Sequence, residues 1–236
     1  YAGFVTPLIG VLQVRCDLTA WQAAFLLSAG PVTSGLAQPV FAWLSDRIDS
    51  RIFGPAGLAV AAAALSSIGL AQTFPTLLLI YGIGMLGVGA FHPVAAASAG
   101  QLAGRRRSLG VTVFFVAGMI GATFGPLIST RVTALPGGFD LLRWAMVPGL
   151  LAAMLLHAAI RSVPHRHHEH HAIRFEPADA RRRWATTVLL SLGNALRYSV
   201  SIGLFYVYVR WAEASVTSTL LEPDPERVAR LGSLYS

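Results

Sequence analysis

Lysine is absent from this chain, and acidic residues and cysteine are scarce. All 18 cationic side chains are arginine, and only 12% of the residues are charged, against roughly 25% in a soluble domain. The single cysteine, Cys16, excludes an intrachain disulfide and a cysteine-rich metal site. Hydrophobic residues make up 54% of the chain. This composition predicts an all-α polytopic membrane protein and argues against a water-soluble fold.

The hydrophobic runs between charged residues predict the membrane spans. No charged residue occurs in 18–45 or, apart from the titratable His92, in 52–104. The second run must hold two spans, because one helix at ~1.5 Å per residue would far exceed a ~30 Å hydrocarbon core, and Gln72-Thr73-Phe74-Pro75 supplies a turn. Six complete spans are expected after a first helix that has lost its beginning: 1–14 (first), 18–45, two within 52–104, 108–130, 141–160 and 184–209.

The arginines between these runs predict the orientation of the spans. A net charge of +7 would favour nucleic-acid binding in a soluble protein, but here arginine collects in every second connection. Those connections are expected on the cytoplasmic side, and the lipid bilayer rather than nucleic acid is the expected partner. They hold Arg47, Arg51, Arg105, Arg106, Arg107, Arg161, Arg166, Arg174, Arg181, Arg182 and Arg183.

One long polar connection divides the chain. We expect an amino-terminal transmembrane lobe over 1–161, a cytoplasmic connection rich in histidine and arginine over 162–183, and a seventh transmembrane helix over 184–209. Residues 210–236 are expected to form an external loop and the start of an eighth helix.

The connection after the second span carries a charged motif, Ala42-Trp-Leu-Ser-Asp46-Arg47-Ile-Asp49-Ser-Arg51. It resembles the G-x-x-x-D-R-x-G-R-R signature of the major facilitator superfamily, with Ala42 and Asp49 in place of glycines. The resemblance implies the general transporter fold of that superfamily, here an amino-terminal six-helix lobe plus helix seven, and a conformational latch made of Asp46, Arg47 and Arg51. The alternative is a charge cluster that only maintains topology.

The fifth span reads Gly118-x-x-Gly121-Ala-Thr-Phe-Gly125-Pro126. Small residues four apart allow close helix approach, and proline can bend a span, so Gly121, Gly125 and Pro126 are predicted to form a helix-packing motif. The same run is similar to a glycine–proline motif found in exporters of the superfamily. It fits plain helix packing equally well.

Two further segments resemble the fosmidomycin-resistance branch of the superfamily. Gly84-Met-Leu-Gly-Val-Gly-Ala-Phe91-His92-Pro93-Val94 is similar to G-x-G-x-x-x-F-H-P-E-A, with Val94 where an acid is expected. The seventh span carries Arg197-Tyr198 followed by an aromatic-rich stretch, which is also similar to that branch.

Arg197 lies near the centre of the seventh span, where an ionised side chain is costly and is a functional candidate by default. With Asn194 and Tyr198 at nearby helical positions, it could bind a phosphonate or carboxylate through two parallel hydrogen bonds. The alternative is a structural arginine bonded to carbonyl groups. Arg197, Asn194 and Tyr198 are the predicted substrate-binding residues.

His92 is the candidate for proton coupling, since imidazole gains or loses a proton near neutral pH and the predicted spans hold no Asp or Glu. The alternative is a histidine hydrogen-bonded between packed helices beside Pro93. The histidine-rich run 165–171 would chelate metal in vitro, but its flexible setting favours a solvated connection, so no metal site is predicted.

The predicted function is secondary active transport, as proton-coupled export of a small organic anion or drug by alternating access. The alternatives are uptake of a sugar or metabolite anion and, in another class, a non-transporting membrane partner. No enzyme motif such as G-x-S-x-G or H-E-x-x-H occurs, and neither enzymatic activity nor a cofactor is expected. We expect a multi-pass protein of the bacterial inner membrane, and a monomer is the favoured oligomeric state.

Overall fold

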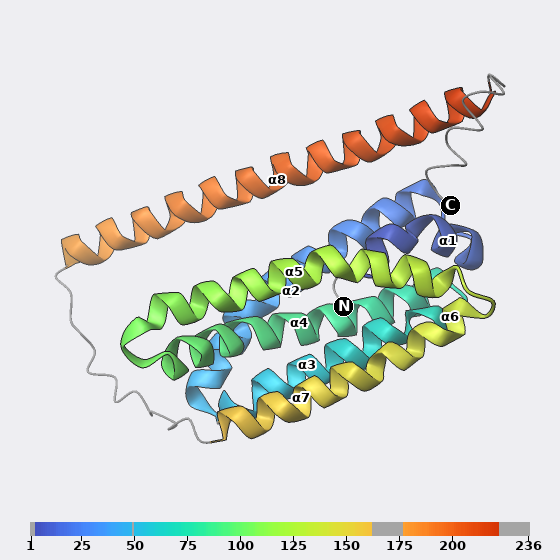
Figure 1. Cartoon of the computed structure of the whole chain (residues 1–236). Coiled ribbons are helices and arrows are strands. Elements are labelled where there is room, and N and C mark those ends of the chain that lie inside the picture. The colour runs from blue at the N-terminus through green and yellow to red at the C-terminus, as the bar shows by residue number, and fades with distance from the viewer. Residues whose placement is uncertain (1–2, 49, 162–176, 222–236) are drawn as a thin grey trace. The chain divides into compact units, whose positions relative to one another are not determined.

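The computed structural model describes residues 3–48, 50–161 and 177–221, and every secondary-structure element among them is helical (Figure 1). The chain divides into two compact units, 1–169 and 170–236, which we describe separately.

The first two helices are separated by a tight turn with clear local signals. Helix α1 (Val5–Cys16) ends at Asp17, whose φ of 50° places it in the left-handed conformation common at helix C-termini. Helix α2 (Ala20–Arg47) begins at Thr19, whose hydroxyl accepts a hydrogen bond from the Gln22 amide while the Gln22 side chain accepts one from the Thr19 amide. This capping box satisfies two amide groups that the helix start would leave unpaired.

The predicted division of the run 52–104 is confirmed. Helix α3 (Ser50–Ser66) continues into the short helix η1 (Ser67–Leu70), and helix α4 (Phe74–Leu102) follows after three residues. Thr73 caps α4 with Thr76, and Pro75 lies in its first turn, where its missing amide hydrogen costs no helical bond. The Gln72–Pro75 turn is therefore set by two of its own residues, Thr73 and Pro75, together with Thr76.

The rest of the first unit alternates long helices with short ones. Its elements are η2 (Gly104–Arg106), α5 (Arg107–Thr133), α6 (Gly138–Leu141), η3 (Leu142–Ala145) and α7 (Met146–Ile160). We call the end of this unit that carries residues 103–106 the inner end, and the end that carries 71–73 and 134–137 the outer end, after the predicted orientation.

Four segments of the described chain are long and apolar enough to cross a membrane: Arg51–Leu70, Phe74–Leu102, Gly104–Thr133 and Gly138–Ile160. Helices α2 and α8 are long enough but fall outside this group. Glutamine, serine and threonine are spread along α2, and α8 contains five arginines and one glutamate. Helix α1 is apolar and has 12 residues.

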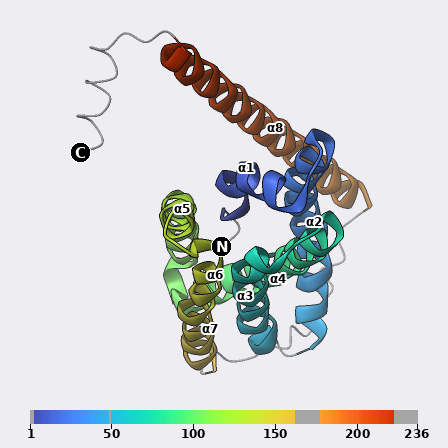
Figure 2. The same cartoon turned by 90° about the vertical axis from the view of Figure 1, so that its right-hand side faces the viewer.

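Helix α4 is the centre of the first unit and packs against α2, α3 and α5, while α3 also packs against α7 (Figure 2). The best-buried large apolar side chains lie in the outer half, between α1 and the adjoining parts of its neighbours. They are Val5, Leu8, Leu12, Leu26, Leu65, Ile68, Leu77 and Leu142.

The second unit contains helix α8 (Pro177–Leu221), which has 45 residues. It covers the span expected over 184–209 and extends beyond it at both ends. Arg181–Arg183 belong to the helix rather than to the connection, and 210–221 are helical rather than loop. At ~1.5 Å per residue α8 is about 68 Å long, more than twice a ~30 Å hydrocarbon core. Arginine limits a membrane span but is a good helix former.

Candidate functional site

The predicted latch residues lie at the inner end of α2 and at the start of α3. Asp46 and Arg47 are exposed in the last turn of α2, and Arg51 is half-buried in the first turn of α3. The Arg47 guanidinium carbon lies 4.0 Å from the centre of the Trp43 ring, one turn earlier, in a cation–π contact. Within the described residues Arg47 forms no ion pair with Asp46. Asp49 lies outside them, and the latch stays a prediction.

The glycines before His92 explain why α4 can lie closely between two other helices. A β-carbon on Gly87 would lie 2.6 Å from the Ala61 amide nitrogen and 2.7 Å from the Gly57 carbonyl oxygen, both on α3. A β-carbon on Gly89 would lie 2.8 Å from the Ala37 side chain on α2. The G-x-G pair thus brings α3 and α2 against opposite sides of α4, and it fixes the position of the residues that follow.

His92 is half-buried and lies four residues, about 6 Å, from the midpoint of α4 towards the inner end. Its ring belongs to a cluster of aromatic side chains from α4 and α5, which we call the aromatic cluster: Phe91, His92, Phe114 and Phe115. The His92 and Phe114 ring centres are 6.1 Å apart at an interplanar angle of 79°, an edge-to-face arrangement. The imidazole is therefore surrounded mainly by hydrocarbon.

The predicted packing motif of α5 divides into two parts. Gly125 is buried, and a β-carbon on it would lie 3.9 Å from the Phe4 ring, while a β-carbon on Gly3 would lie 3.5 Å from the Pro126 side chain. A β-carbon on Gly121 would meet no atom within 4 Å in the described part of the chain. Gly125 and Pro126 therefore lie beside the segment before α1, and the packing role of the three residues stays a prediction.

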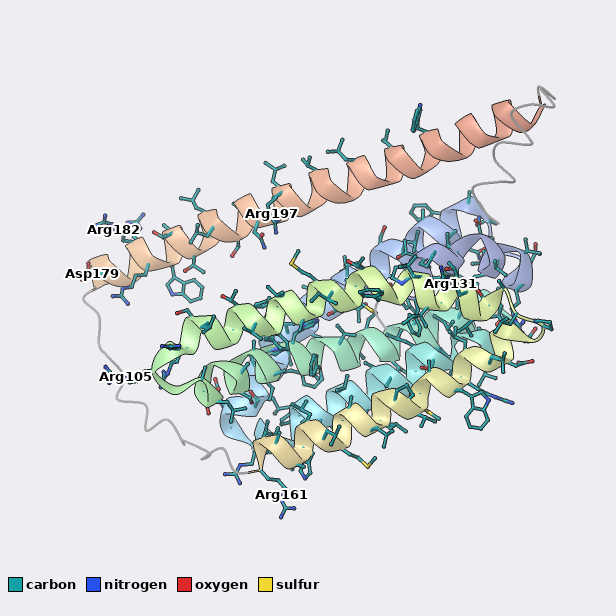
Figure 3. The ribbon with its side chains drawn as sticks, in the orientation of Figure 1. Arg105, Arg131, Arg161, Asp179, Arg182 and Arg197 are labelled. Carbon is teal, nitrogen blue, oxygen red and sulfur yellow. The ribbon has the colours of Figure 1, made fainter. Side chains whose placement is uncertain are left out.

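Arg197 and Asn194 are in contact on α8, where they lie three residues, less than one turn, apart. The Arg197 Nε and Nη2 groups donate hydrogen bonds of 3.4 and 3.3 Å to the Asn194 side-chain oxygen (Figure 3). Arg197 lies two residues from the midpoint of the helix. The Tyr198 side chain and the histidine run 165–171 lie outside the described residues.

The sequence profile of the Major Facilitator Superfamily matches residues 2–221, which is nearly all of the chain. The chain belongs to this superfamily. The expected family is therefore confirmed, and with it the all-α multi-pass membrane fold. The superfamily consists of transporters and not of enzymes, as the sequence led us to expect.

Two curated relatives give the finer resemblance. The chain is 29% identical to the fosmidomycin resistance protein of Escherichia coli (strain K12) over 146 residues, 62% of this chain and 36% of that protein. It is 26% identical to the uncharacterized MFS-type transporter YfnC of Bacillus subtilis (strain 168) over 156 residues, 66% of this chain and 38% of that protein. The chain thus spans less than two-fifths of the length of these relatives. No solved structure matches it significantly.

Three residues that the sequence did not single out contact residues of the superfamily motifs. Trp43 lies inside the inner-loop motif, three residues before Asp46. Its ring forms a cation–π contact with Arg47, which the motif does not indicate. Phe114 is one of many aromatic residues in apolar runs, and nothing in its spacing links it to His92. Gly57 carried no signal except its residue type, although it faces the backbone of Gly87.

Proposed function

We propose that this superfamily chain forms part of a secondary transporter of the bacterial inner membrane that exports a small organic anion or drug in exchange for protons. Alternating access of a central site to the two membrane faces is the expected mechanism. The observation that carries the proposal is the Arg197–Asn194 pair near the middle of α8.

The pair supports an anionic substrate. Two nitrogens of the guanidinium share one amide oxygen, which holds the plane of the guanidinium in a fixed orientation relative to α8. An oriented guanidinium recognises two oxygens of a carboxylate, phosphate or phosphonate at once. A permanent positive charge at this depth is costly in lipid, so a substrate anion that neutralises it has a direct energetic benefit.

The aromatic cluster supports a proton-binding role for His92. The imidazole is held between α4 and α5 by ring contacts, and it lies within about 6 Å of the helix midpoint. A group that changes charge at this depth alters the electrostatic energy of the conformation that surrounds it. Protonation of His92 would thereby favour one access state over the other.

The name of the Escherichia coli relative supplies the first substrate to test. Fosmidomycin is a phosphonate, and the oriented guanidinium of Arg197 suits such a group. The full-length protein should protect an Escherichia coli strain that lacks its own fosmidomycin resistance protein. In inside-out vesicles, an imposed proton gradient should drive fosmidomycin into the lumen. Substrate-driven uptake in the opposite direction, without resistance, would support the import alternative instead.

Variants of the two site residues separate their roles. We expect Arg197→Ala to reduce phosphonate transport by about tenfold or more at every pH, because a charged hydrogen-bonding partner of the anion is lost. We expect His92→Ala to flatten the dependence of the transport rate on pH between about pH 5.5 and 8, the range in which imidazole titrates. Both are measured as initial rates in vesicles with equal amounts of transporter.

Wild-type transport and pH dependence in both variants would contradict the assignment of Arg197 and His92. Absence of any transport by the full-length wild type, across phosphonates, carboxylates and sugars, would contradict the transport function itself and support a non-transporting membrane partner.

A further inference from the structure

At the outer end of the first unit, the last two residues of α1 bind one backbone carbonyl of a distant connection. The Arg15 Nε group donates a hydrogen bond of 3.4 Å to the Ala71 carbonyl oxygen, and the Cys16 thiol donates one of 3.6 Å to the same atom. Ala71 follows η1 and precedes α4, so it is 56 and 55 residues away from these donors in sequence. Two adjacent side chains of α1 are thus tied to the α3–α4 connection.

A third segment joins the same place. The Arg15 guanidinium carbon lies 5.2 Å from the centre of the Phe139 ring, which belongs to α6. The carbonyl oxygen of Phe139 also lies so close to η1 that a β-carbon on Gly69 would be 2.6 Å from it. Arg15 therefore contacts α6 through its charge and the α3–α4 connection through its N–H group, while α6 and η1 are in direct backbone contact.

Burial strengthens these contacts. Cys16 is 6% exposed, Ala71 has no exposed surface, and Leu142, which follows α6, is 1% exposed. They belong to one apolar cluster together with Leu18 and Ile68. Hydrogen bonds in such a setting have little competition from water, and a cation over an aromatic ring gains strength as it is desolvated.

We propose that Arg15, Cys16, Ala71 and Phe139 form an outer clasp that makes the end of α1, the α3–α4 connection and α6 move as one body. The end of α1 then does not slide or fray separately from the α3–α4 connection and α6. The outer clasp goes beyond the proposed function, because it depends neither on the substrate nor on proton coupling.

Cys16 supplies the readout, since it is both a member of the outer clasp and the one cysteine of the chain. The full-length protein, in lipid nanodiscs, is treated with N-ethylmaleimide, and mass spectrometry of the peptide that contains Cys16 follows its modification with time. We expect Arg15→Ala to raise the modification rate roughly tenfold, because a hydrogen bond and a cation–π contact that hold the segment closed are lost. Phe139→Leu, which keeps an apolar side chain but removes the ring, should also raise it.

Arg131→Ala is the matched control, because Arg131 is an exposed arginine in the last turn of α5 at the same outer end (Figure 3). In this variant, the rate at which N-ethylmaleimide modifies Cys16 should equal that of the wild type. In the double variant Arg15→Ala/Phe139→Leu, the rate should rise less than the product of the two single effects, as for groups that act through one contact.

If Arg15→Ala fails to yield a monodisperse protein, Phe139→Leu and the milder Arg15→Gln test the outer clasp by the same measurement of the Cys16 modification rate. Modification rates that match the control in the variants that fold would overturn the outer clasp. This result is independent of transport, so a substrate assay that fails would leave it unaffected.

Discussion

At the residue scale, the Arg197–Asn194 contact follows from sequence spacing alone. Residues three apart on a helix lie on the same face, and the Asn194 amide oxygen is within reach of the Arg197 guanidinium. Arg47 is similar, since Trp43 lies four residues before it on α2, but Arg15 and His92 differ, because they contact residues that are distant in sequence and that no motif indicates. Arg47 stacks on Trp43, and His92 stands edge-to-face with Phe114 on another helix.

The first residue-scale prediction concerns the shape of the charge at position 197. Arg197→Lys keeps the positive charge but replaces a planar fork of donors with a single ammonium group. We expect the transport of a phosphonate or carboxylate to fall about tenfold, close to the loss in Arg197→Ala. Arg131→Lys is the matched control and should transport as the wild type does. Full activity of Arg197→Lys in vesicle assays would show that charge suffices and that no oriented contact is needed.

At the element scale, α4 is held by its own glycines. It presents Gly87 to α3 and Gly89 to α2, and the approach is close enough that backbone atoms are the neighbours. In a membrane, lipid is as apolar as the side chains, so helix association relies on close packing of small residues rather than on exclusion of water. The Gly87 and Gly89 pair before His92 therefore has a packing function.

The element-scale prediction compares two glycines of the same helix. Gly87→Ala places a methyl group within 2.7 Å of the Ala61 amide and the Gly57 carbonyl, which cannot move aside as flexible side chains can. We expect it to lower the free energy of unfolding by ~1–3 kcal/mol, the usual cost of overpacking. Gly82→Ala is the control, since a β-carbon there meets nothing within 4 Å.

Thermal unfolding of the detergent-purified full-length protein measures both variants. The apparent melting temperature should fall for Gly87→Ala and stay level or rise for Gly82→Ala, where alanine improves helix propensity. Equal melting temperatures would argue against close α3–α4 packing at Gly87.

At the scale of the whole molecule, the alternating arginine content of the connections predicts the orientation. Arg105, Arg106 and Arg107 are consecutive and exposed at the inner end, between α4 and α5. The opposite connection, 134–137, has no charged residue. Positive residues are retained on the cytoplasmic side of a membrane, so the inner end should face the cytoplasm.

Impermeant maleimide tests this orientation in a Cys16→Ser background. Leu135→Cys at the outer end and Leu102→Cys at the inner end form a matched pair, because the two leucines are 55% and 58% exposed. Intact cells should label only Leu135→Cys, and inside-out vesicles only Leu102→Cys. The reverse labelling pattern would show that the inner end faces outwards, and the expected direction of transport would then be reversed as well.

The sequence by itself determined the fold class, the family and most helix boundaries, because these depend on local properties. The lengths of apolar runs, the Thr19 and Thr73 caps and the 72–75 turn act within a few residues along the chain. Helix α8 extends beyond the predicted span 184–209 because charge marks the limit of a membrane span and not the end of a helix.

Only the tertiary structure decided which distant residues meet. Ala71 receives Arg15 and Cys16, Gly57 faces Gly87, and Phe114 meets His92. Each contact joins helices whose relative rotation and depth depend on the packing of all their neighbours, so neither residue type nor spacing could have indicated it.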